Sequence, residues 1–430
     1  MSGTRRCPAL LIAATASGQG KTTVTAALAR SHARQGRRVR VFKTGPDFLD
    51  PMLLEAASGA PVYNVDSWMV GIEESRARLS AAARDADLIL VEGAMGLYDG
   101  EPCAADLAQD FGLPVAAVID AYGMAQTFGA LAAGLKSWRS LDFAGVIANR
   151  IGGPGHRALI EASLPSDIRL LAAFARASRP LPERHLGIVQ ANELQQRDAL
   201  LDELARLAEE GGAAALPRAV AFPGGKLIEP ARLLAQTRIA IARDRAFSFI
   251  YRANIECLAA MGAETLFFSP LAGERIPEAD ALYLPGGYPE LHAAQLRGAS
   301  AWFDSLRQFA RSGRPVYAEC GGLMVLLDEI VALDRRAYRM AGVLPGRAVM
   351  RERLAALGLQ SLALAQGALR GHSFHYSTME TPLAPVARCR NLRGGDGEPV
   401  YRQNAITASY FHAYFPSCPA AIAAIFRGER

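Results

Sequence analysis

Lysine is scarce in this chain of 430 residues, whose positive charge lies mostly on arginine. The only lysines are Lys21, Lys43, Lys136 and Lys226. Genomic base composition explains such a bias, although arginine also suits bidentate binding of carboxylates, so an arginine-rich surface is compatible with a polyanionic substrate. The formal net charge of +5 is modest, and no long basic tail is present. We therefore expect no nucleic-acid partner.

Long hydrophobic runs are absent as well. The apolar segments 9–14 and 88–91 have the length of strands and are far too short to cross a bilayer. Arg5 and Arg6 precede only a short apolar run, so this segment does not resemble a secretory signal. We expect a cytoplasmic protein that has no membrane partner.

Paired cysteine motifs, internal repeats and low-complexity tracts are also missing. The six cysteines are widely scattered and form no CxxC pair, which argues against a disulfide framework and against a zinc site. The hydrophobic content of 50% with frequent Gly and Pro fits a folded α/β protein.

The length is too great for one ordinary core, so we expect two domains. Short apolar runs alternate with longer amphipathic stretches, as in a parallel sheet with helical crossovers. A stretch rich in Gly, Ala and Pro at 211–236 indicates a linker between domains at 1–210 and 237–430. Predicted strands cover residues 9–14, 39–43, 87–91, 115–119, 144–149, 238–242, 281–284 and 315–318, with another near Leu266, and predicted helices cover residues 21–35 and 193–210.

A glycine-rich segment, Thr15-Ala16-Ser17-Gly18-Gln19-Gly20-Lys21-Thr22, lies between the first predicted strand and the first predicted helix. Such a loop points backbone N–H groups at a phosphate, and the helix N-terminus adds partial positive charge. Lys21 would reach the terminal phosphates of ATP. Thr15 stands where the usual pattern has its first glycine, so an ordinary turn before a helix is the alternative. The predicted nucleotide-binding residues are Ser17, Gly18, Gly20, Lys21, Thr22 and Thr23.

Carboxylates follow the next two predicted strands. Asp47 and Asp50 come after the second strand, and Glu92 and Asp99 come after the third. The carboxyl ends of strands in an open sheet face the ligand crevice. We therefore expect Thr22, Asp47 and Glu92 to hold Mg²⁺ together with phosphate oxygens. For each single carboxylate, a role in a turn or a helix cap is the alternative.

A second glycine-rich turn, Ala318-Glu319-Cys320-Gly321-Gly322, follows the predicted strand 315–318. The apolar run after it, residues 323–330, is expected to be helical. A cysteine at such a turn lies near a helix N-terminus, which lowers the thiol pKa from about 8.5 towards neutrality. Small neighbours also let a backbone amide, that of Gly321, face a developing oxyanion.

Two further segments complete this second centre. Gly287, in a loop after strand 281–284, is the candidate for a second oxyanion donor, with an ordinary turn as the alternative. His412 is the candidate general base for Cys320. His372 and His375 are rivals for that role. One chain with a phosphate loop and a cysteine nucleophile predicts glutamine-dependent amide synthesis driven by ATP.

With these motifs in this order, the chain resembles the cobyrinate a,c-diamide synthases. In that family a domain similar to dethiobiotin synthetase is joined to a class I glutamine amidotransferase-like domain. The resemblance implies a P-loop NTPase-like, doubly wound, mostly parallel sheet in the first domain and an amidotransferase-like α/β fold in the second. The segments that carry it are residues 15–22, 43–51, 92–100, 182–187, 286–293, 318–323, 370–376 and 409–412.

The resemblance also implies the reaction. ATP and Mg²⁺ would activate the a and c carboxylates of a corrinoid polycarboxylate, cobyrinate or hydrogenobyrinate, as acyl phosphates in cobalamin biosynthesis. Cys320, with His412, would release ammonia from L-glutamine, and the ammonia would pass internally and displace phosphate. Asp50 and Asp99 are expected to orient the substrate or the acyl phosphate. A homodimer is compatible with this function.

Two positions depart from the broader amidotransferase pattern. Ala318 replaces the Gly that usually lies two residues before the nucleophile, and Tyr414 stands where many class I enzymes place a Glu two residues after the His. The missing Glu fits the cobyrinic branch, whose members resemble Cys–His dyads. It leaves open what orients His412.

Two other functions stay open at this point. The same machinery would amidate another tetrapyrrole, such as a nickel sirohydrochlorin. The second alternative is a regulatory ATPase with a degenerate amidotransferase domain. Partitioning ATPases carry a signature lysine in the phosphate loop where this chain has Ala16, which weighs against a partner-driven switch.

Overall fold

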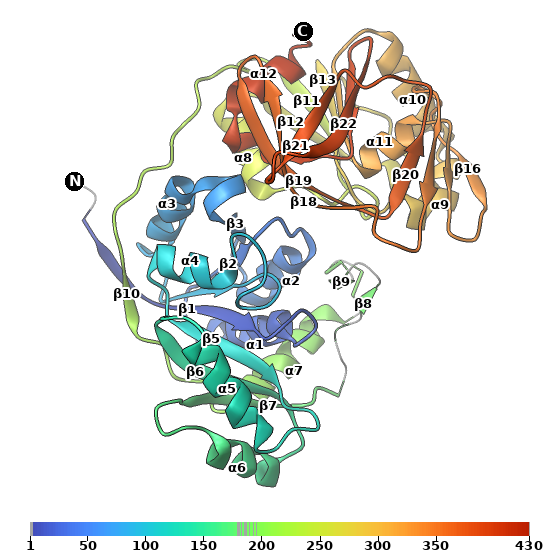
Figure 1. Cartoon of the computed structure of the whole chain (residues 1–430). Coiled ribbons are helices and arrows are strands. Elements are labelled where there is room, and N and C mark those ends of the chain that lie inside the picture. Colours follow the sequence, from blue (N-terminus) through green and yellow to red (C-terminus); the bar gives the residue numbers. More distant parts are fainter. Residues whose placement is uncertain are drawn as a thin grey trace. The chain divides into compact units, whose positions relative to one another are not determined.

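The computed structural model describes residues 3–178, 181, 183–184, 187–188, 190–191, 193–194 and 196–429. The chain divides into two compact units, Met1–Ile228 and Glu229–Arg430 (Figure 1). This division falls within the segment 211–236 that was predicted to be a linker. Part of that segment is a strand instead, because β10 (Ala219–Phe222) pairs antiparallel with β1 (Arg5–Ala14) in the first unit.

The first unit is built around a sheet with the strand order β3-β2-β4-β1-β5-β6-β7, in which neighbouring strands run parallel. Strand β1 is buried on both faces, with Leu10 and Ile12 in one apolar cluster and Leu11 in another. Such a strand appears in the sequence as a continuous hydrophobic run. The other strands are β2 (Val39–Thr44), β3 (Tyr63–Val65), β4 (Leu88–Glu92), β5 (Val115–Asp120), β6 (Phe143–Ile151) and β7 (Leu170–Ala175), and a separate antiparallel pair is β8 (Glu183–Arg184) with β9 (Gly187–Ile188).

Helices cover both faces of this sheet. Side chains of α1, α2 and α7 pack into one apolar cluster, and those of α3, α4, α5 and α6 pack on the opposite face. This doubly wound arrangement brings the carboxyl ends of the central strands to one edge, where ligands bind in such folds. The helices are α1 (Lys21–Arg34), α2 (Leu49–Ser58), α3 (Ile72–Ala82), α4 (Ala104–Phe111), α5 (Thr127–Ser137), α6 (Pro154–Ser163) and α7 (Arg197–Glu210), with a π-helical turn, η1 (Ser67–Gly71).

The second unit contains a mixed sheet with the order β12-β11-β13-β14-β23-β22-β21-β18-β19-β24. Its first five strands run parallel and the remaining pairs are antiparallel. The strands of this sheet are β11 (Arg238–Ala242), β12 (Glu264–Phe268), β13 (Ala281–Leu284), β14 (Val316–Glu319), β18 (Ala356–Leu364), β19 (Gly367–His375), β21 (Ala387–Asn391), β22 (Asp396–Gln403), β23 (Ile406–Ser409) and β24 (His412–Ala413). A smaller sheet, in the order β16-β15-β17-β20, consists of β15 (Glu329–Val331), β16 (Ala337–Arg339), β17 (Arg347–Met350) and β20 (Ser377–Glu380).

Two apolar clusters lie against the mixed sheet. One contains side chains of α9, α10 and α11, with the fully buried Trp302 among them, and the other contains side chains of α8 and α12. The helices are α8 (Arg252–Ala260), α9 (Ala293–Gly298), α10 (Ser300–Arg311), α11 (Gly321–Leu326) and α12 (Pro419–Phe426), with 3₁₀ turns η2 (Pro270–Ala272), η3 (Pro289–His292) and η4 (Phe415–Ser417).

Two predicted helices have different bounds in the structure. The helix predicted at 193–210 begins only at Arg197. Gln196, directly before it, has a left-handed backbone with φ of 55°, which is incompatible with a regular helix. The helix predicted at 323–330 is wrong at its carboxyl end. It stops at Leu326, and residues 329–331 form strand β15, which pairs with β16 and β17.

The segment 182–187 that contributed to the family resemblance lies partly outside the described residues, since Pro182, His185 and Leu186 are not among them. Within the described part of the chain, no helix is both long enough and apolar enough to cross a membrane.

Candidate active sites

The predicted phosphate loop lies between β1 and α1, as the sequence indicated. Ser17 and Gly18 are exposed, and α1 begins at Lys21. Gly20 has a φ of 87°, in the left-handed region that favours glycine, and a Cβ there would lie only 2.2 Å from Asn149 Nδ2. The geometry is that of a glycine-rich loop with accessible backbone in front of a helix N-terminus, which is suited to binding an anion.

Three side chains at the ends of β5 and β6 support this loop, and sequence analysis missed all of them. Asn149 Nδ2 donates a hydrogen bond to the carbonyl oxygen of Gln19 at 3.0 Å. Arg150 Nη2 donates to the carbonyl oxygen of Gly18 at 2.9 Å, and its Nη1 lies 3.2 Å from Asp120 Oδ2. Their position at the carboxyl ends of predicted strands was the signal that pointed to them.

Lys21 is folded over the loop. Its Nζ donates a hydrogen bond to the carbonyl oxygen of Ala16 at 3.1 Å. Burial, followed by the nearby ammonium of Lys43, lowers the pKa of Lys21 to about 8, while the carboxylates of Glu92, Asp50 and, least, Asp99 oppose that shift. A bound phosphate would favour the charged form of this lysine.

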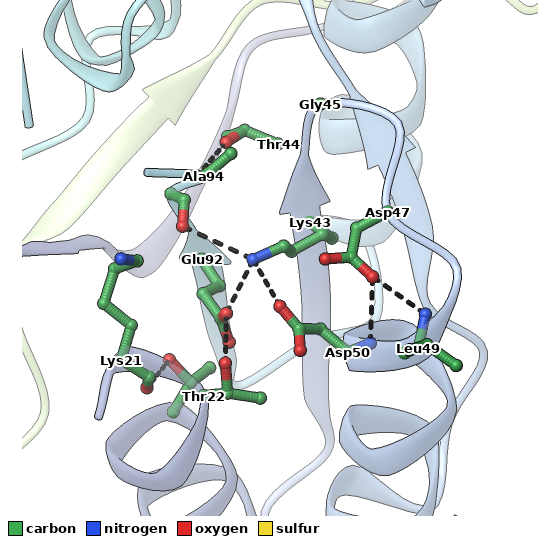
Figure 2. A network of polar contacts seen from close by, with 12 residues as sticks. Lys21, Thr22, Lys43, Thr44, Gly45, Asp47, Leu49, Asp50, Glu92 and Ala94 are labelled. Atoms are coloured by element: carbon green, nitrogen blue, oxygen red, sulfur yellow. Dashed lines mark hydrogen bonds and ion pairs between the residues drawn. The ribbon is translucent and has the colours of Figure 1, made fainter. Parts of the chain in front are cut away.

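Glu92 is the last residue of β4 and contacts both the loop helix and β2. Its Oε1 accepts hydrogen bonds from Thr22 Oγ1 at 2.8 Å and from Lys43 Nζ at 2.7 Å (Figure 2). Thr23, the next residue of α1, is partly buried. Among the described residues, none donates a hydrogen bond to the buried Oε2 of Glu92.

This arrangement fits a magnesium ion that is shared with a phosphate. A buried carboxylate oxygen without a donor, next to a hydroxyl, supplies the hard oxygen ligands that Mg²⁺ prefers. In the described part of the chain, no group of three or more His, Cys, Asp or Glu side chains is arranged to hold a metal ion by itself. Phosphate oxygens and water would therefore have to complete the coordination.

Lys43 lies at the centre of the acidic residues and is 3% exposed. Its Nζ is 2.7 Å from Asp50 Oδ2, 2.7 Å from Glu92 Oε1 and 3.4 Å from the carbonyl oxygen of Gly93 (Figure 2). Burial alone would lower the pKa of Lys43, but the carboxylates of Asp50 and Glu92 raise it, so the side chain stays charged. Lys43 is not among the predicted site residues, although lysine is rare in this chain and Lys43 lies at the end of a predicted strand.

The two aspartates after β2 have different surroundings. Asp47 Oδ1 accepts hydrogen bonds from the backbone N–H groups of Leu49 and Asp50 at 2.8 and 3.1 Å. It therefore caps α2, the alternative that the sequence left open for each carboxylate. Burial, and then the charge of Asp50, raise the pKa of Asp47 to about 7. Partial burial would raise the pKa of Asp50, whose side chain is 14% exposed, but the ion pair with Lys43 lowers it.

Replacing Lys43 with methionine is expected to destabilise the first unit by about 3–5 kcal/mol, because it leaves the buried carboxylate of Glu92 and the partly buried one of Asp50 without their cation. The deficit should shrink at lower pH, where those carboxyl groups can be protonated in the folded state. Thermal and denaturant unfolding of Lys43→Met at two pH values measures both effects. Lys226→Met, at an exposed lysine of the same unit, is the control. Equal stability of the two variants would contradict the assigned ion pair.

In the second unit, Cys320 stands at a sharp turn between β14 and α11. Its φ of 45° and ψ of −106° place a non-glycine residue in a strained, left-handed region. Its backbone N–H donates to the carbonyl oxygen of Ser409 at 2.8 Å, and its own carbonyl accepts from the N–H of Met324 at 3.0 Å. A strained strand-to-helix turn of this kind is the geometry of a nucleophile elbow.

The expectation of an acidic thiol is wrong for this structure. Burial raises the pKa of Cys320 well above its usual range, and the carboxylate of Glu290 adds to the effect. The backbone N–H of Gly321 opposes the shift but does not overcome it, because α11 is short and the thiol is 4% exposed. Activation of this thiol therefore requires a base in contact with it.

His412 is in the right place to be that base. A Cβ built on Gly286 would lie 2.3 Å from His412 Cε1 and 3.4 Å from Cys320 Cβ, so the two side chains meet over this glycine. Burial lowers the pKa of His412 well below its usual value, and the nearby His372 and His375 add to the shift. A neutral imidazole beside a protonated thiol can accept the thiol proton.

The two rival histidines have other partners. His372 Nδ1 lies 3.0 Å from the hydroxyl of Tyr251, and its ring stacks on that of His412 with centroids 5.0 Å apart. His375 has both ring nitrogens engaged, with Nδ1 2.8 Å from the carbonyl oxygen of Ser377 and Nε2 3.0 Å from Glu398 Oε1. These contacts favour His412 as the base.

The expected oxyanion donors lie side by side. A Cβ on Gly321 would lie 3.1 Å from the backbone nitrogen of Gly287. Gly287 has a φ of 156°, and a Cβ there would be 2.1 Å from the carbonyl oxygen of Ala246, so this position accepts only glycine. The structure brings both glycines to Cys320, and their role as donors to an oxyanion stays a prediction.

Gly286 gives a test of this geometry. The variant Gly286→Ala should displace the His412 ring and lower glutaminase activity by about 10²–10⁴-fold, the usual contribution of a general base. Ammonia-dependent amide synthesis should persist. Glutamate release and amide formation are measured separately, with Gly298→Ala as the control because nothing lies within 4 Å of a Cβ at that position. Wild-type glutaminase activity in Gly286→Ala would show that His412 is not held there.

Comparisons with known proteins found relatives of both halves of the chain. Residues 10–184 match the CobQ/CobB/MinD/ParA nucleotide binding domain, and residues 238–419 match the CobB/CobQ-like glutamine amidotransferase domain. Hydrogenobyrinate a,c-diamide synthase of Stutzerimonas stutzeri is 56% identical over 98% of this chain and 99% of its own length. The chain belongs to the a,c-diamide synthase family.

Two other relatives show the breadth of the family. Cobyrinate a,c-diamide synthase of Herminiimonas arsenicoxydans is 52% identical over 100% of this chain and 98% of its own length. Hydrogenobyrinate a,c-diamide synthase of Pseudomonas aeruginosa is 52% identical over 99% of this chain and 98% of its own length. The predicted family and the predicted fold class, a nucleotide-binding α/β domain followed by an amidotransferase domain, are confirmed.

Proposed function

We propose that this protein is a glutamine-hydrolysing ligase that amidates the a and c side-chain carboxylates of cobyrinate or hydrogenobyrinate in cobalamin biosynthesis, with ATP as the energy source. The observation that carries the proposal is the presence of both centres in one chain, together with end-to-end similarity to relatives named for this reaction. The phosphate-loop centre supplies activation, and the cysteine centre supplies nitrogen.

The first unit activates the carboxylate. Ser17, Gly18, Gly20, Lys21, Thr22 and Thr23 hold the phosphates of ATP. When Mg²⁺ is bound, by Thr22, Glu92 and Asp47, it neutralises phosphate charge. Glu92 is in contact with Thr22, whereas Asp47 is engaged at the start of α2, so Asp47 would act through its other oxygen or through water.

A substrate carboxylate oxygen then attacks the terminal phosphorus, ADP leaves, and an acyl phosphate forms. Positioning and charge stabilisation are the main contributions that a protein makes to such a transfer. Lys21 supplies charge to the transferred group. Asp50 and Asp99 are proposed to orient the carboxylate or its acyl phosphate. Ammonia attacks the acyl carbon, inorganic phosphate leaves, and the amide remains after loss of a proton.

The second unit makes ammonia. His412 removes the thiol proton from Cys320 as the sulfur attacks the side-chain amide carbon of glutamine, and the N–H groups of Gly287 and Gly321 stabilise the oxyanion. The proton returns to the leaving nitrogen, which departs as ammonia. Water then hydrolyses the glutamyl thioester and restores the thiol.

A substrate panel tests the assignment. The protein is incubated with ATP, Mg²⁺ and glutamine and with cobyrinate, hydrogenobyrinate or nickel sirohydrochlorin, and the products are analysed by mass spectrometry. Two amidations of cobyrinate or hydrogenobyrinate are expected. Amidation of the nickel macrocycle alone, or of none, would contradict the proposal. A cytoplasmic location and a homodimer stay predictions.

A further inference from the structure

Glu319 is a buried carboxylate next to the nucleophile, and none of the steps above uses it. It is the last residue of β14, directly before Cys320, and is 1% exposed. Side chains alternate along a strand, so Glu319 shares a face of the sheet with Tyr317 and points away from the face of Ala318. The apolar clusters agree, since Tyr317 and Ala318 belong to different ones.

The carboxylate of Glu319 accepts hydrogen bonds from residues of two other strands. The hydroxyl of Tyr283 on β13 donates to Oε2 at 2.8 Å, and the backbone N–H of Ala413 on β24 donates to Oε1 at 3.0 Å. The nearby hydroxyl of Tyr317 also favours the ionised form of Glu319 and opposes the rise of its pKa. A carboxylate surrounded by donors is fixed in place, and it accepts from them best when it is ionised.

His412 lies close to this carboxylate, at a distance longer than a hydrogen bond. Its Nδ1 is 3.9 Å from Glu319 Oε2, and the residue whose backbone N–H binds Oε1 is the next one in the chain, Ala413. Glu319 therefore contacts the backbone just after the histidine and faces the ring nitrogen as well. In catalytic sites such distances often shorten only when the reacting complex forms.

Glu319 supplies an acidic group that this chain lacks at the position usual in class I amidotransferases. Many class I amidotransferases carry a Glu two residues after the histidine, where this chain has Tyr414. The Tyr414 ring is buried and packs edge-on against Tyr251, with centroids 5.6 Å apart. Among the described residues, Glu319 is an acidic group within 4 Å of the His412 ring, and it comes from the residue before the nucleophile, on a different strand.

The carboxylate of Glu319 can balance a positive charge that forms during glutamine hydrolysis. When His412 accepts the thiol proton it becomes an imidazolium ion in a fully buried site, and an uncompensated buried charge is strongly unfavourable. Burial raises the pKa of Glu319 to about 7, although the N–H of Ala413 and the hydroxyl of Tyr283 oppose this shift. The imidazolium would favour its ionised form and would itself be stabilised in return.

We propose that Glu319 is the positioning residue of His412, fixing the imidazole with Nδ1 protonated and balancing the charge of the imidazolium during glutamine hydrolysis. This inference deepens the proposed function and rests on it. The centre is then a Cys–His–Glu arrangement in which the acidic member precedes the nucleophile instead of following the base.

The variant Glu319→Gln tests it, because glutamine keeps the volume and an oxygen for the N–H of Ala413 but removes the charge. We expect kcat for glutamine hydrolysis to fall about 10²-fold or more while KM for glutamine changes little, since the lost interaction is made in the transition state. Ammonia-dependent synthesis should be unchanged. Glu319→Asp, which restores the charge, should recover part of the lost kcat.

A spectroscopic measurement distinguishes loss of His412 positioning from a general loss of structure. In ¹⁵N-histidine NMR spectra, the signals of His412 are assigned by their loss in His412→Gln. The wild-type protein should show His412 protonated at Nδ1, and Glu319→Gln should lose this fixed tautomer. Glu398→Gln is the matched control, because Glu398 is another buried carboxylate but pairs with His375.

Three results would overturn the inference: a wild-type kcat in Glu319→Gln, an unchanged His412 tautomer in that variant, or a Glu319→Asp variant no better than Glu319→Gln. If Glu319→Gln does not fold, Glu319→Asp is the test. Its kcat for glutamine hydrolysis must then fall while ammonia-dependent synthesis stays unchanged, and an equal loss of these two activities would contradict a positioning role for Glu319. A wild-type protein without glutaminase activity would instead contradict the proposed function itself.

Discussion

The Lys21→Ala variant is expected to lose amide synthesis by at least about 10²–10³-fold, even when ammonia replaces glutamine. Lys21 begins α1, its ammonium lies over the phosphate loop, and burial already depresses its pKa to about 8, so a bound phosphate would be its natural counter-charge. The measurement is amide formation with saturating ammonium, ATP and substrate. Glutamine hydrolysis in the same variant should persist, because the cysteine centre lies in the other unit.

Lys136→Ala is the control for this variant. Lys136 is a lysine of the same unit whose partner is the exposed Asp167, remote in sequence from the loop. It should retain near wild-type synthesis, since surface substitutions away from special features have small effects. Substantial ammonia-dependent synthesis by Lys21→Ala would mean that ATP is bound elsewhere in the chain.

The Cys320→Ser variant should show the opposite pattern. Glutamine-dependent synthesis is expected to fall by roughly 10⁴-fold or more, because loss of a nucleophile removes the whole covalent route. Ammonia-dependent synthesis should stay at the wild-type level, since only nitrogen delivery is lost. The comparison of the two nitrogen sources in one preparation is the measurement.

Cys257→Ser controls for the loss of a buried thiol, because Cys257 lies in α8 and is 6% exposed. It should keep both activities. Full glutamine-dependent synthesis by Cys320→Ser would contradict the assignment of the nucleophile and, with it, the division of labour between the two units.

Much of the framework could be predicted from the sequence because it depends on local pattern. Strands β1, β2 and β4 are short apolar runs between amphipathic stretches, and the glycine-rich loop follows the first of them. Parallel pairing then brings residues at the ends of these strands together, as Lys43 and Glu92 on β2 and β4 show. The elbow at Cys320 was likewise predicted from its small neighbours.

What the sequence could not give depends on contacts between distant segments. The position of Asn149 at the end of a strand pointed to the ligand edge of the sheet, but not to its hydrogen bond with Gln19. Glu319 lies near His412 only because β13, β14 and β24 come together. The thiol pKa of Cys320 was predicted in the wrong direction because the sequence shows the helix start but not the depth of burial. The end of α11 was missed because pairing of β15 with two strands overrides a run of helix-compatible residues.

Isotope labelling tests whether the two centres act together, with nitrogen from glutamine ending in the amides of the product. The wild-type protein is supplied with ATP, Mg²⁺, the macrocycle and glutamine labelled with ¹⁵N at its side-chain amide, in buffer that contains unlabelled ammonium. Both new amides of the product should carry ¹⁵N if, as we expect, the ammonia made at Cys320 passes to the acyl phosphate without mixing with the buffer. Unlabelled amides, or consumption of glutamine without any amidated macrocycle, would contradict the proposal that the two centres act together.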